Sequence, residues 1–449
     1  MDVTEEDYDA ACGDRLSWRT RGATVSAFET SAVHRNDREA DGPSVLLSHP
    51  TGNQNVRNAV KGLAESTMLA EFWTTLVWDP ESIWSRIVPQ GLRTQLIRRS
   101  FAGIPKDRIR SVPWREIVRL GARPRLARDL LCSLERPFSV IGMYRHFDGK
   151  VADRLRTLHP DAVYAYEGGA LNSFREAKRL GISALYELPS SYWYWEHELL
   201  SKEAERNPAF AGLLPKLRDS PGHMQWKDEE LRLADYIFVP SQHVRQTLSG
   251  VVSDERIRVI SYGSPPVRAR KSPAITPGQP LKVLFVGALI QRKGISYLLD
   301  AIDQLGQQVE LTLIGARYRE NTRVDEACNR WRWIESLPHA QVIEMMLEAD
   351  VLVLPSLTEG CALVVLEALS CGLPVIVTAN TGSLEFVRDG HEGFVVPLCN
   401  ADAIADRLSV LNRNRDLLIE MSKSAQATAG KKSWESYRIN WVRAVREAA

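Results

Sequence analysis

Short apolar runs that end in turn-forming residues alternate with helical patterns along most of this chain. The first run is Ser44–Ser48, which leads into the loop His49–Asn55, and a helical pattern begins near Val56. A buried strand, a glycine-containing loop and a helix form the first half of a βαβ unit. The same order recurs at three further predicted strands, namely Asp161–Tyr166, Ile182–Leu188 and Asp235–Pro240. This alternation predicts a parallel, doubly wound sheet.

A proline-rich segment interrupts the alternation and predicts a linker at 266–280. The alternation then restarts, and strands are predicted at Lys282–Val286, Glu310–Ile314, Gln341–Val342, Val351–Leu354, Pro374–Val377 and Gly393–Val396. The fold class is therefore α/β, with one lobe at 41–265 and a second after the linker. Residues 1–40 are polar and weakly patterned, which is typical of a tail.

Composition narrows the class of protein. Of the 449 residues, 44% are apolar and 25% are charged, as in soluble globular proteins, and the net charge of +1 gives no global attraction to nucleic acid. Six scattered cysteines contain no Cys-x-x-Cys pair, which argues against a zinc site and a disulfide framework. The N-terminus is acidic and has no apolar run, so we expect no signal peptide and no membrane span. We therefore expect a cytoplasmic protein.

The first motif with chemical potential is Phe285–Gly294, in which a strand ends at Gly287 and a helix begins near Gly294. Arg292 and Lys293 then lie at the carboxyl end of a strand, where open α/β sheets bind ligands. Two cations beside a helix N-terminus suit a diphosphate. A solvated loop with two surface cations explains this motif equally well.

The second motif follows the apolar strand Val351–Leu354. Glu359 lies in the loop, and Glu367 lies about two turns into an otherwise apolar helix. A carboxylate in such surroundings needs hydrogen-bond partners, and sugar hydroxyls are suitable donors. A buried salt bridge is the alternative.

These motifs together carry a family resemblance. The pattern E-x7-E from Glu359 to Glu367, followed by Ala368–Ile376, resembles the signature of glycosyltransferase family 4. Three further segments are similar to that family, namely Gly287–Gly294, Ala234–Ser241 and Thr381–Gly390. The resemblance is dense from Leu231 to Pro397 and looser from Ser44 to Leu188.

The resemblance implies the GT-B architecture, in which two Rossmann-like lobes face each other across a cleft. It implies that 281–430 binds a UDP- or GDP-type sugar, that 41–265 binds the acceptor, and that the last helix, 431–449, crosses back to the N-terminal lobe. No metal and no other cofactor are expected. Ala288 stands where many members have an arginine.

Residue roles follow from the same resemblance. Arg292 and Lys293 would contact the diphosphate near Gly287, Glu359 the donor sugar and Glu367 the ribose. Backbone amides at the helix start would hold phosphate, at Gly360, Cys361, Ala362 and Leu363.

The N-terminal lobe supplies two further candidate segments. In the loop His49–Asn58, Gly52 permits close approach of the backbone to the nucleotide sugar, and Asn53 lies beside it. Asn55 and Arg57 offer hydrogen-bond donors on the acceptor side. An Asx-rich turn that caps a helix is the alternative. Glu167, in Tyr166–Gly169, is a candidate carboxylate near the reacting carbon, and a turn role explains it as well.

Two features bear on the acceptor. The stretch 92–131 is rich in arginine with interleaved apolar residues, which suits anionic lipid at the inner face of a membrane or a lipid-diphosphate acceptor. A solvated helical surface is the alternative. The aromatic run Ser191–His197 could stack on sugar rings or pack in the core.

The sequence thus predicts a retaining hexosyltransferase that uses a nucleotide sugar and a glycan, glycolipid or other hydroxyl acceptor, in surface polysaccharide or glycoconjugate assembly. A non-catalytic subunit that kept the fold to bind nucleotide sugars is the alternative from another class. A GT-B nucleotide-sugar epimerase would need an acid/base set that the sequence does not present.

Overall fold

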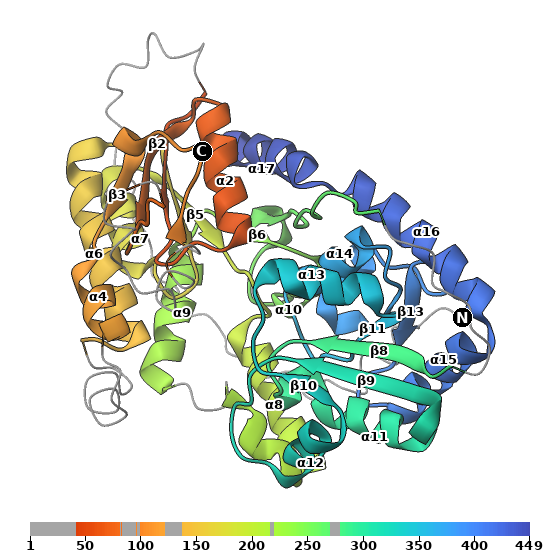
Figure 1. The fold of residues 1–449 in the computed structure, drawn as a ribbon. Helices are drawn as coiled ribbons and strands as arrows, with labels where there is room; N and C mark the ends of the chain where they lie inside the picture. The colour runs from red at the N-terminus through yellow and green to blue at the C-terminus, as the bar shows by residue number, and fades with distance from the viewer. Residues whose placement is uncertain are drawn as a thin grey trace. The chain divides into compact units, whose positions relative to one another are not determined.

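A computed structural model describes residues 42–80, 82, 96, 99–121, 137–215, 220–269 and 279–449. The predicted tail 1–40, residues 270–278 of the predicted linker and much of the arginine-rich stretch lie outside these residues. The described chain contains two parallel β-sheets, each with helices packed on it (Figure 1).

The N-terminal sheet has the strand order β3-β2-β1-β4-β5-β6-β7. Its strands are β1 (Val45–Ser48), β2 (Leu69–Thr74), β3 (Ile109–Ser111), β4 (Ala162–Tyr166), β5 (Ser183–Glu187), β6 (Tyr236–Val239) and β7 (Ile257–Val259). Val45 is paired with Leu69 on one side and with Ala162 on the other, both in parallel register. Every residue of β1 is buried, because helices cover both faces of a parallel sheet.

The helices of this lobe are α2 (Gln54–Glu65), α4 (Trp114–Gly121), α6 (Val140–Leu158), α7 (Leu171–Leu180), α8 (Trp193–Arg206), α9 (Pro221–Leu233) and α10 (Gln242–Thr247). Successive side chains of β4 enter different cores. Val163 packs with Phe147 and Phe174 from α6 and α7. Tyr164 points to the other face and packs with Val56 from α2.

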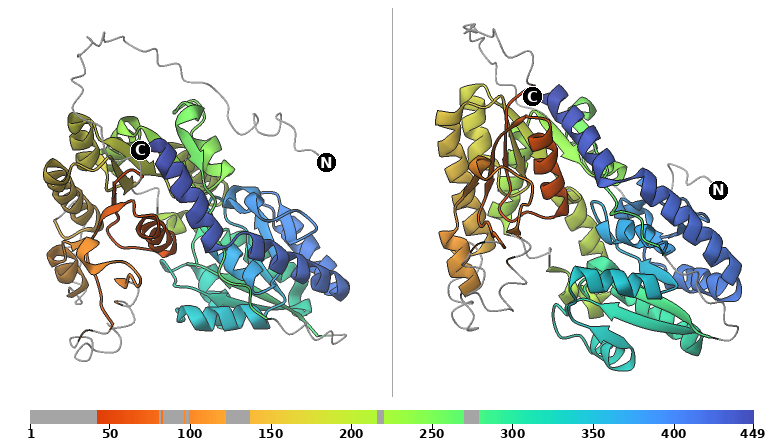
Figure 2. Two further views of the ribbon diagram at one scale, coloured as in Figure 1. Left: turned by 90° about the horizontal axis from the view of Figure 1, so that it is seen from above. Right: turned by 45° about the horizontal axis from the view of Figure 1, so that its top comes forward.

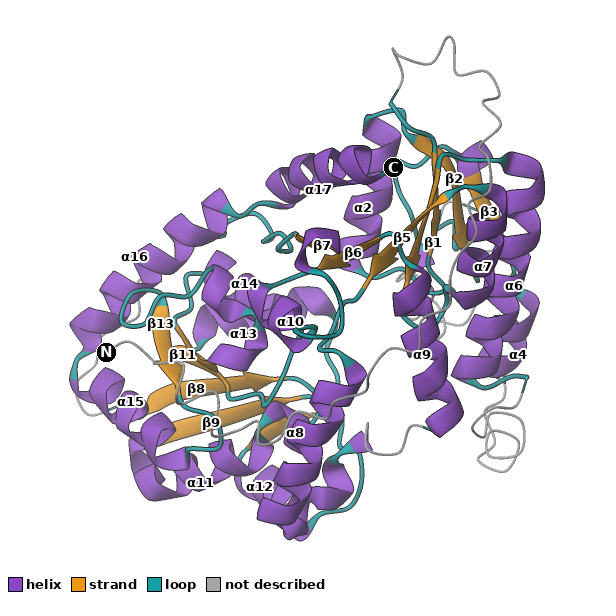
Figure 3. Cartoon of the chain, turned by 180° about the vertical axis from the view of Figure 1, so that it is seen from behind, coloured by secondary structure: helices purple, strands orange, loops and turns teal. Residues whose placement is uncertain are grey.

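The C-terminal sheet has the strand order β10-β9-β8-β11-β12-β13, and all its pairs are parallel. Its strands are β8 (Leu281–Val286), β9 (Val309–Ile314), β10 (Arg332–Ile334), β11 (Val351–Leu354), β12 (Val375–Thr378) and β13 (Gly393–Val396). Its helices are α11 (Ile295–Leu305), α12 (Thr322–Arg330), α13 (His339–Glu348), α14 (Leu363–Ser370), α15 (Ala401–Arg413) and α16 (Arg415–Lys431) (Figure 3). In both sheets the order reverses beside the first strand, so each lobe is Rossmann-like.

One predicted strand is wrong. Gln341–Val342 lies inside α13, where Val342, Ile343 and Met346 are buried on one helical face. The apolar run was too short to distinguish the two periods. The strands β2, β3, β7 and β10 were not predicted. Among the described residues, no helix is long and apolar enough to cross a lipid bilayer.

The last helix, α17 (Trp434–Ala448), packs against α2 (Figure 2). Trp441 Nε1 donates a 3.1 Å hydrogen bond to the Tyr164 hydroxyl, and Trp441 is fully buried. The two chain segments that join the lobes touch each other: a Cβ at Gly263 would lie 2.5 Å from the Trp434 Cα atom, so this contact requires glycine. The α17 helix is thereby fastened to both the sheet and the joining segments.

Candidate functional site

Two loops of the C-terminal lobe meet where its strand order reverses. One loop follows β8 and the other follows β11, and these strands are neighbours. Open α/β sheets bind ligands outside the carboxyl ends of such strands. The fold therefore brings together the two segments that carried the strongest sequence motifs.

The loop after β8 owes its path to glycines. Gly287 has φ +155°, and the Lys293 side chain lies over it, with Cε 3.6 Å from a Cβ built there. Gln291–Lys293 forms a 3-10 turn that ends at Gly294, with φ +71°. A Cβ at Gly294 would lie 2.0 Å from the Pro355 carbonyl oxygen, so only glycine permits this approach of the two loops.

Arg292 and Lys293 converge on Glu359. Lys293 Nζ lies 2.6 Å and Arg292 Nη1 2.9 Å from Glu359 Oε1. Arg292 Nη1 also donates to the Thr358 carbonyl oxygen at 2.8 Å. Within the described part of the chain both of these ion-pair contacts fall on Oε1, which leaves Oε2 as an acceptor toward further donors. The structure thus places these three predicted residues in one cluster.

Electrostatics fixes the charge state of this cluster. Burial raises the pKa of Glu359, but the charges of Lys293 and Arg292 and their hydrogen bonds lower it more, so the pKa lies below its ordinary value. Burial lowers the pKa of Arg292, while Glu359 and Glu196 raise it above its ordinary value. Glu359 is therefore ionised beside Lys293 and Arg292, and the Glu196 carboxylate lies 4.0 Å from the other side of Arg292.

The backbone between Glu359 and α14 is held from two sides. The Glu359 amide donates to the Asn380 carbonyl oxygen at 2.8 Å, and the Ala362 amide donates to that of Thr381 at 3.1 Å. Ser241 of the N-terminal lobe donates to the Gly360 carbonyl oxygen at 2.6 Å. Of the four predicted phosphate-binding amides, that of Ala362 is therefore engaged within the protein in this structure.

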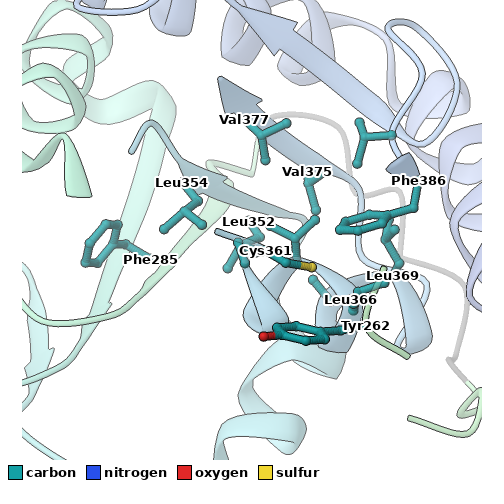
Figure 4. Packing of buried hydrophobic residues seen from close by; sticks show 14 of the residues in the cluster. Tyr262, Phe285, Leu352, Leu354, Cys361, Leu366, Leu369, Val375, Val377 and Phe386 are labelled. Carbon is teal, nitrogen blue, oxygen red and sulfur yellow. The ribbon is translucent and has the colours of Figure 1, made fainter. Parts of the chain in front are cut away.

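Gly360 and Cys361 pack under the N-terminal lobe. A Cβ at Gly360 would lie 1.8 Å from the Pro189 carbonyl oxygen. Cys361 is buried in the core beside Leu366 and Tyr262, and Tyr262 comes from the segment after β7 (Figure 4). Leu363 begins α14. The predicted helix start thus sits at a seam between the lobes.

A hydrogen-bonded trio lies on the same seam and was missed from the sequence. Ser191 Oγ is 2.6 Å from Thr358 Oγ1 and 3.0 Å from His243 Nε2. All three residues are buried. Burial lowers the pKa of His243 to about 4, so the ring is neutral. Thr358 directly precedes Glu359, but Ser191 and His243 are distant in the sequence and gave no motif.

Glu367 lies in α14, away from the Glu359 cluster. Its Oε1 is 2.9 Å from His339 Nε2 of α13, and its side chain is 21% exposed. The structure therefore gives this carboxylate a partner that is itself largely exposed. The Glu367 side chain remains within reach of solvent.

The predicted N-terminal-lobe residues take mostly structural positions. Gly52 has φ +77°, and its close neighbour is Phe101, whose Cζ would lie 2.4 Å from an added Cβ. Asn53 caps α2 by accepting from the Val56 amide at 3.1 Å, as the alternative interpretation held. Asn55 is buried and donates to the Tyr262 hydroxyl at 3.1 Å. Their contribution to a ligand site stays a prediction.

Two other predicted residues lie in this lobe. Arg57 is in the first turn of α2, where its amide donates to the Asn53 carbonyl oxygen at 3.0 Å. Glu167 Oε1 pairs with Lys227 Nζ of α9 at 3.3 Å, and both side chains are mostly buried. Lys227 was not predicted, because an isolated lysine on an amphipathic helix gives no sequence signal.

Buried acids at the strand edge were also missed. Glu230 of α9 accepts from the Gly168 amide at 2.7 Å and the Ala170 amide at 2.8 Å, and burial raises its pKa to about 8. Glu187 ends β5, and burial raises its pKa to about 7. Glu187 lies at the end of a predicted strand, so an acid at that strand end was an available signal, whereas Glu230 lies inside α9.

The described arginines of the stretch 92–131 are engaged within the protein. Arg99 and Arg119 both pair with Glu116, which is fully buried. Arg110 pairs with Glu71 at 3.1 Å. Beside them, four large apolar side chains are exposed, at Trp114, Ile117, Val118 and Val140.

Comparison with known proteins bears on this geometry. Residues 268–428 match the family model described as "Glycosyl transferases group 1". This range contains both loops of the Glu359 cluster. The match lies in the C-terminal lobe and does not include the N-terminal lobe.

Two relatives are similar over about a third of the chain. An uncharacterized glycosyltransferase of Methanocaldococcus jannaschii is 30% identical over 154 residues, which is 34% of this chain and 44% of that protein. The putative colanic acid biosynthesis glycosyltransferase WcaL of Salmonella typhimurium is 31% identical over 173 residues, 35% of this chain and 43% of that protein. The chain thus spans less than half the length of these relatives.

A solved structure extends the likeness to both lobes. HepE from Anabaena, in complex with UDP and glucose, superimposes with a TM-score of 0.60 over 90% of this chain and 100% of its own, at 16% identity. At this identity the likeness shows the fold. The architecture is GT-B, as the sequence predicted.

Proposed function

We propose that the chain is a glycosyltransferase that transfers a hexosyl unit from a UDP- or GDP-type sugar to a hydroxyl acceptor, with retention of configuration and without a bound metal. One observation carries this proposal: Arg292, Lys293 and Glu359 meet at the switch point of the C-terminal sheet. The family match over the same loops supports it, as does the UDP and glucose bound to HepE.

The geometry supports a division of roles. Lys293 and Arg292 bind the diphosphate, and the Oε2 atom of Glu359 accepts from hydroxyls of the donor sugar. The amides of Gly360, Cys361 and Leu363 lie at the start of α14, where the helix dipole favours phosphate. Glu367 binds the ribose and shares its carboxylate with His339.

The reaction requires stabilisation of a leaving group. The bond from the anomeric carbon to the diphosphate breaks, the acceptor oxygen forms the new bond on the same face, and its proton passes to a diphosphate oxygen. Negative charge grows on the diphosphate during this step. Fixed cations in a water-poor site are effective against such charge. In this proposal Glu167 lies near the reacting carbon, and Asn55 and Arg57 lie on the acceptor side.

The cellular setting is also part of the proposal. WcaL is described as acting in colanic acid biosynthesis, and we propose surface polysaccharide or glycoconjugate assembly for this chain. We propose that the exposed side chains of Trp114, Ile117 and Val118 on α4 form an apolar patch with Val140 at the start of α6. We propose that this patch, in a cytoplasmic protein, contacts the inner face of a membrane that holds the acceptor.

The experiment is incubation of the full chain with a panel of UDP, GDP and ADP sugars, with and without sugar and lipid-linked acceptors. Release of the nucleoside diphosphate measures turnover, and calorimetry measures binding. Turnover with one class of donor supports the enzyme. Binding without turnover supports the non-catalytic subunit, and the absence of both overturns the proposal.

A further inference from the structure

The helix α8 leaves the N-terminal sheet yet lies along the C-terminal lobe (Figures 1 and 3). Its start is tied to the N-terminal lobe. Tyr192 and Trp193 donate side-chain hydrogen bonds to Asp228 of α9 at 2.8 and 2.6 Å. The Tyr192 amide also donates to Thr247 of α10 at 3.0 Å.

The far end of α8 is tied to the C-terminal lobe. Asn207, which follows the helix, donates to Ser296 of α11 at 3.0 Å. Asn321 at the start of α12 donates to the Ala209 carbonyl oxygen at 2.8 Å. Phe210 then buries its ring in the same core. The C-terminal end of α8, a helix of the N-terminal lobe, is therefore hydrogen-bonded to the C-terminal lobe.

Two buried carboxylates lie on one face of α8, seven residues apart. Glu203 accepts from Gln291 Nε2 at 2.6 Å and from the Tyr297 hydroxyl at 2.7 Å. Gln291 is itself fully buried, and its Nε2 also donates to Ser296 Oγ at 2.6 Å. Gln291 directly precedes Arg292 and Lys293, the two cations of the candidate site. Glu203 therefore fixes the position of the residue next to these cations.

Glu196 is the second carboxylate. It is 3% exposed at the side chain, and its Oε1 lies 4.0 Å from Arg292 Nε. The opposite end of the guanidinium donates to Glu359 and to the Thr358 carbonyl oxygen. Arg292 is therefore held between a carboxylate of each lobe.

We propose that Glu196 and Glu203 are positioning residues for the cations that bind the donor diphosphate. The proposal rests on the donor site described under Proposed function. Glu203 orients the loop through Gln291, and Glu196 retains Arg292 when Glu359 turns toward a sugar hydroxyl. Burying two carboxylates is costly, and the hydrogen bonds to Glu203 and the Arg292 charge beside Glu196 offset part of that cost. The N-terminal lobe thereby contributes to the geometry of the donor site.

The test compares Glu196→Gln and Glu203→Gln with Glu198→Gln and Glu205→Gln, two exposed glutamates of the same helix. Release of nucleoside diphosphate from the donor panel gives kcat and the donor KM. We expect kcat to fall about ten- to a hundredfold at the buried positions, because small misplacements at a reacting centre have effects of that size. The donor KM should change less, because the charge on the diphosphate grows only in the transition state. Both control variants should have the kcat and KM of the wild type.

A second variant guards against loss of folding. Tyr297→Phe removes one donor to Glu203 and keeps the ring, and it should lower kcat in the same direction with an unchanged melting temperature. If the wild type is active and all three variants behave like the controls, the inference alone fails. If the wild type binds UDP or GDP without turnover, weaker binding by Glu196→Gln supports the inference and equal binding overturns it. If the wild type neither binds nor reacts, the donor site and the inference fail together.

Discussion

Lys293 Nζ lies 2.6 Å from Glu359 Oε1, and this ion pair joins the loops after two neighbouring strands, β8 and β11. A cation and an anion fixed in this way form a site that a diphosphate can enter only by competing for the cation. Substitutions of the two residues are therefore expected to change donor binding and turnover to different extents.

Lys293→Ala is expected to lower turnover by at least about a hundredfold, because it removes a fixed positive charge beside the leaving diphosphate. The Lys293 side chain is 15% exposed and Arg292 still pairs with Glu359 when Lys293 is removed, so the fold should survive. Steady-state release of nucleoside diphosphate measures the effect, with circular dichroism as the check on folding. Lys423→Ala, at an exposed position of α16, is the matched control. Wild-type turnover in Lys293→Ala would refute the site.

Glu359→Gln should lower turnover and strengthen the binding of free nucleotide. Turnover should fall, because the amide replaces the carboxylate that accepts from the donor sugar. Free UDP or GDP should bind about fivefold more tightly, or roughly 1 kcal/mol, because the anion that competes for Lys293 and Arg292 is gone. Titration calorimetry at low salt measures the binding. Weaker nucleotide binding by this variant would mean that Glu359 holds the cations in their binding geometry.

Gly360→Ala tests the seam between the lobes. The new Cβ would lie 1.8 Å from the Pro189 carbonyl oxygen, so the loop and the N-terminal lobe must move apart. We expect turnover to fall at least about tenfold, because the loop that carries Glu359 shifts. Gly149→Ala in α6 has nothing within 4 Å of the added atom and should be neutral or slightly stabilising. Equal activity of both variants would show that the seam has no catalytic role.

The sequence predicted the central strands because burial on both faces makes them continuous apolar runs, as in Val351–Leu354. It missed β3, β7 and β10, which have three residues each and are partly exposed. It placed a strand at Gln341–Val342, where Pro338 and the spacing of Val342, Ile343 and Met346 give a helix. It also missed β2, which has six residues and is mostly buried, so length explains only the three short strands.

Some residues of the candidate site could be predicted from the sequence and others could not. Arg292, Lys293 and Glu359 lie in loops with local motifs, and the parallel sheet brings these loops together. Glu196 and His243 reach the same cluster only through the packing of one lobe on the other, and no local pattern encodes that contact. Asn53 shows the reverse case, since its turn chemistry predicts the helix cap that the structure contains.

The exposed apolar patch on α4 predicts membrane contact. Trp114 is 48% and Ile117 55% exposed, and the nearby arginines are engaged with Glu116 and Glu71. Trp114→Ser with Ile117→Ser should therefore reduce binding to anionic lipid vesicles by about tenfold, mainly through lost apolar burial. Vesicle sedimentation measures this, and Leu384→Ser, at an exposed apolar residue of the other lobe, is the control. Equal binding by the wild type, the double variant and the control would exclude the patch.

Glu187 gives a stability prediction with a definite sign. It is 2% exposed and accepts from the hydroxyls of Tyr164 and Tyr262. Burial raises its pKa from 4.5 to about 7 in the folded protein. Between these values the folded state keeps a proton that the unfolded state releases, so this group makes stability fall as pH rises from about 4.5 to 7 and has no further effect above that.

The loss attributable to Glu187 across this window is about 3 kcal/mol, at roughly 1.4 kcal/mol for each tenfold change in proton affinity. Glu187→Gln keeps the shape and removes the titration, so its urea unfolding free energy should lose that slope relative to the wild type. Unfolding at pH 5, 6, 7 and 8 measures the difference between the two proteins. The difference should grow in favour of the variant from pH 5 to about 7 and then level off. A constant difference would mean that Glu187 is already ionised in the folded protein at pH 5.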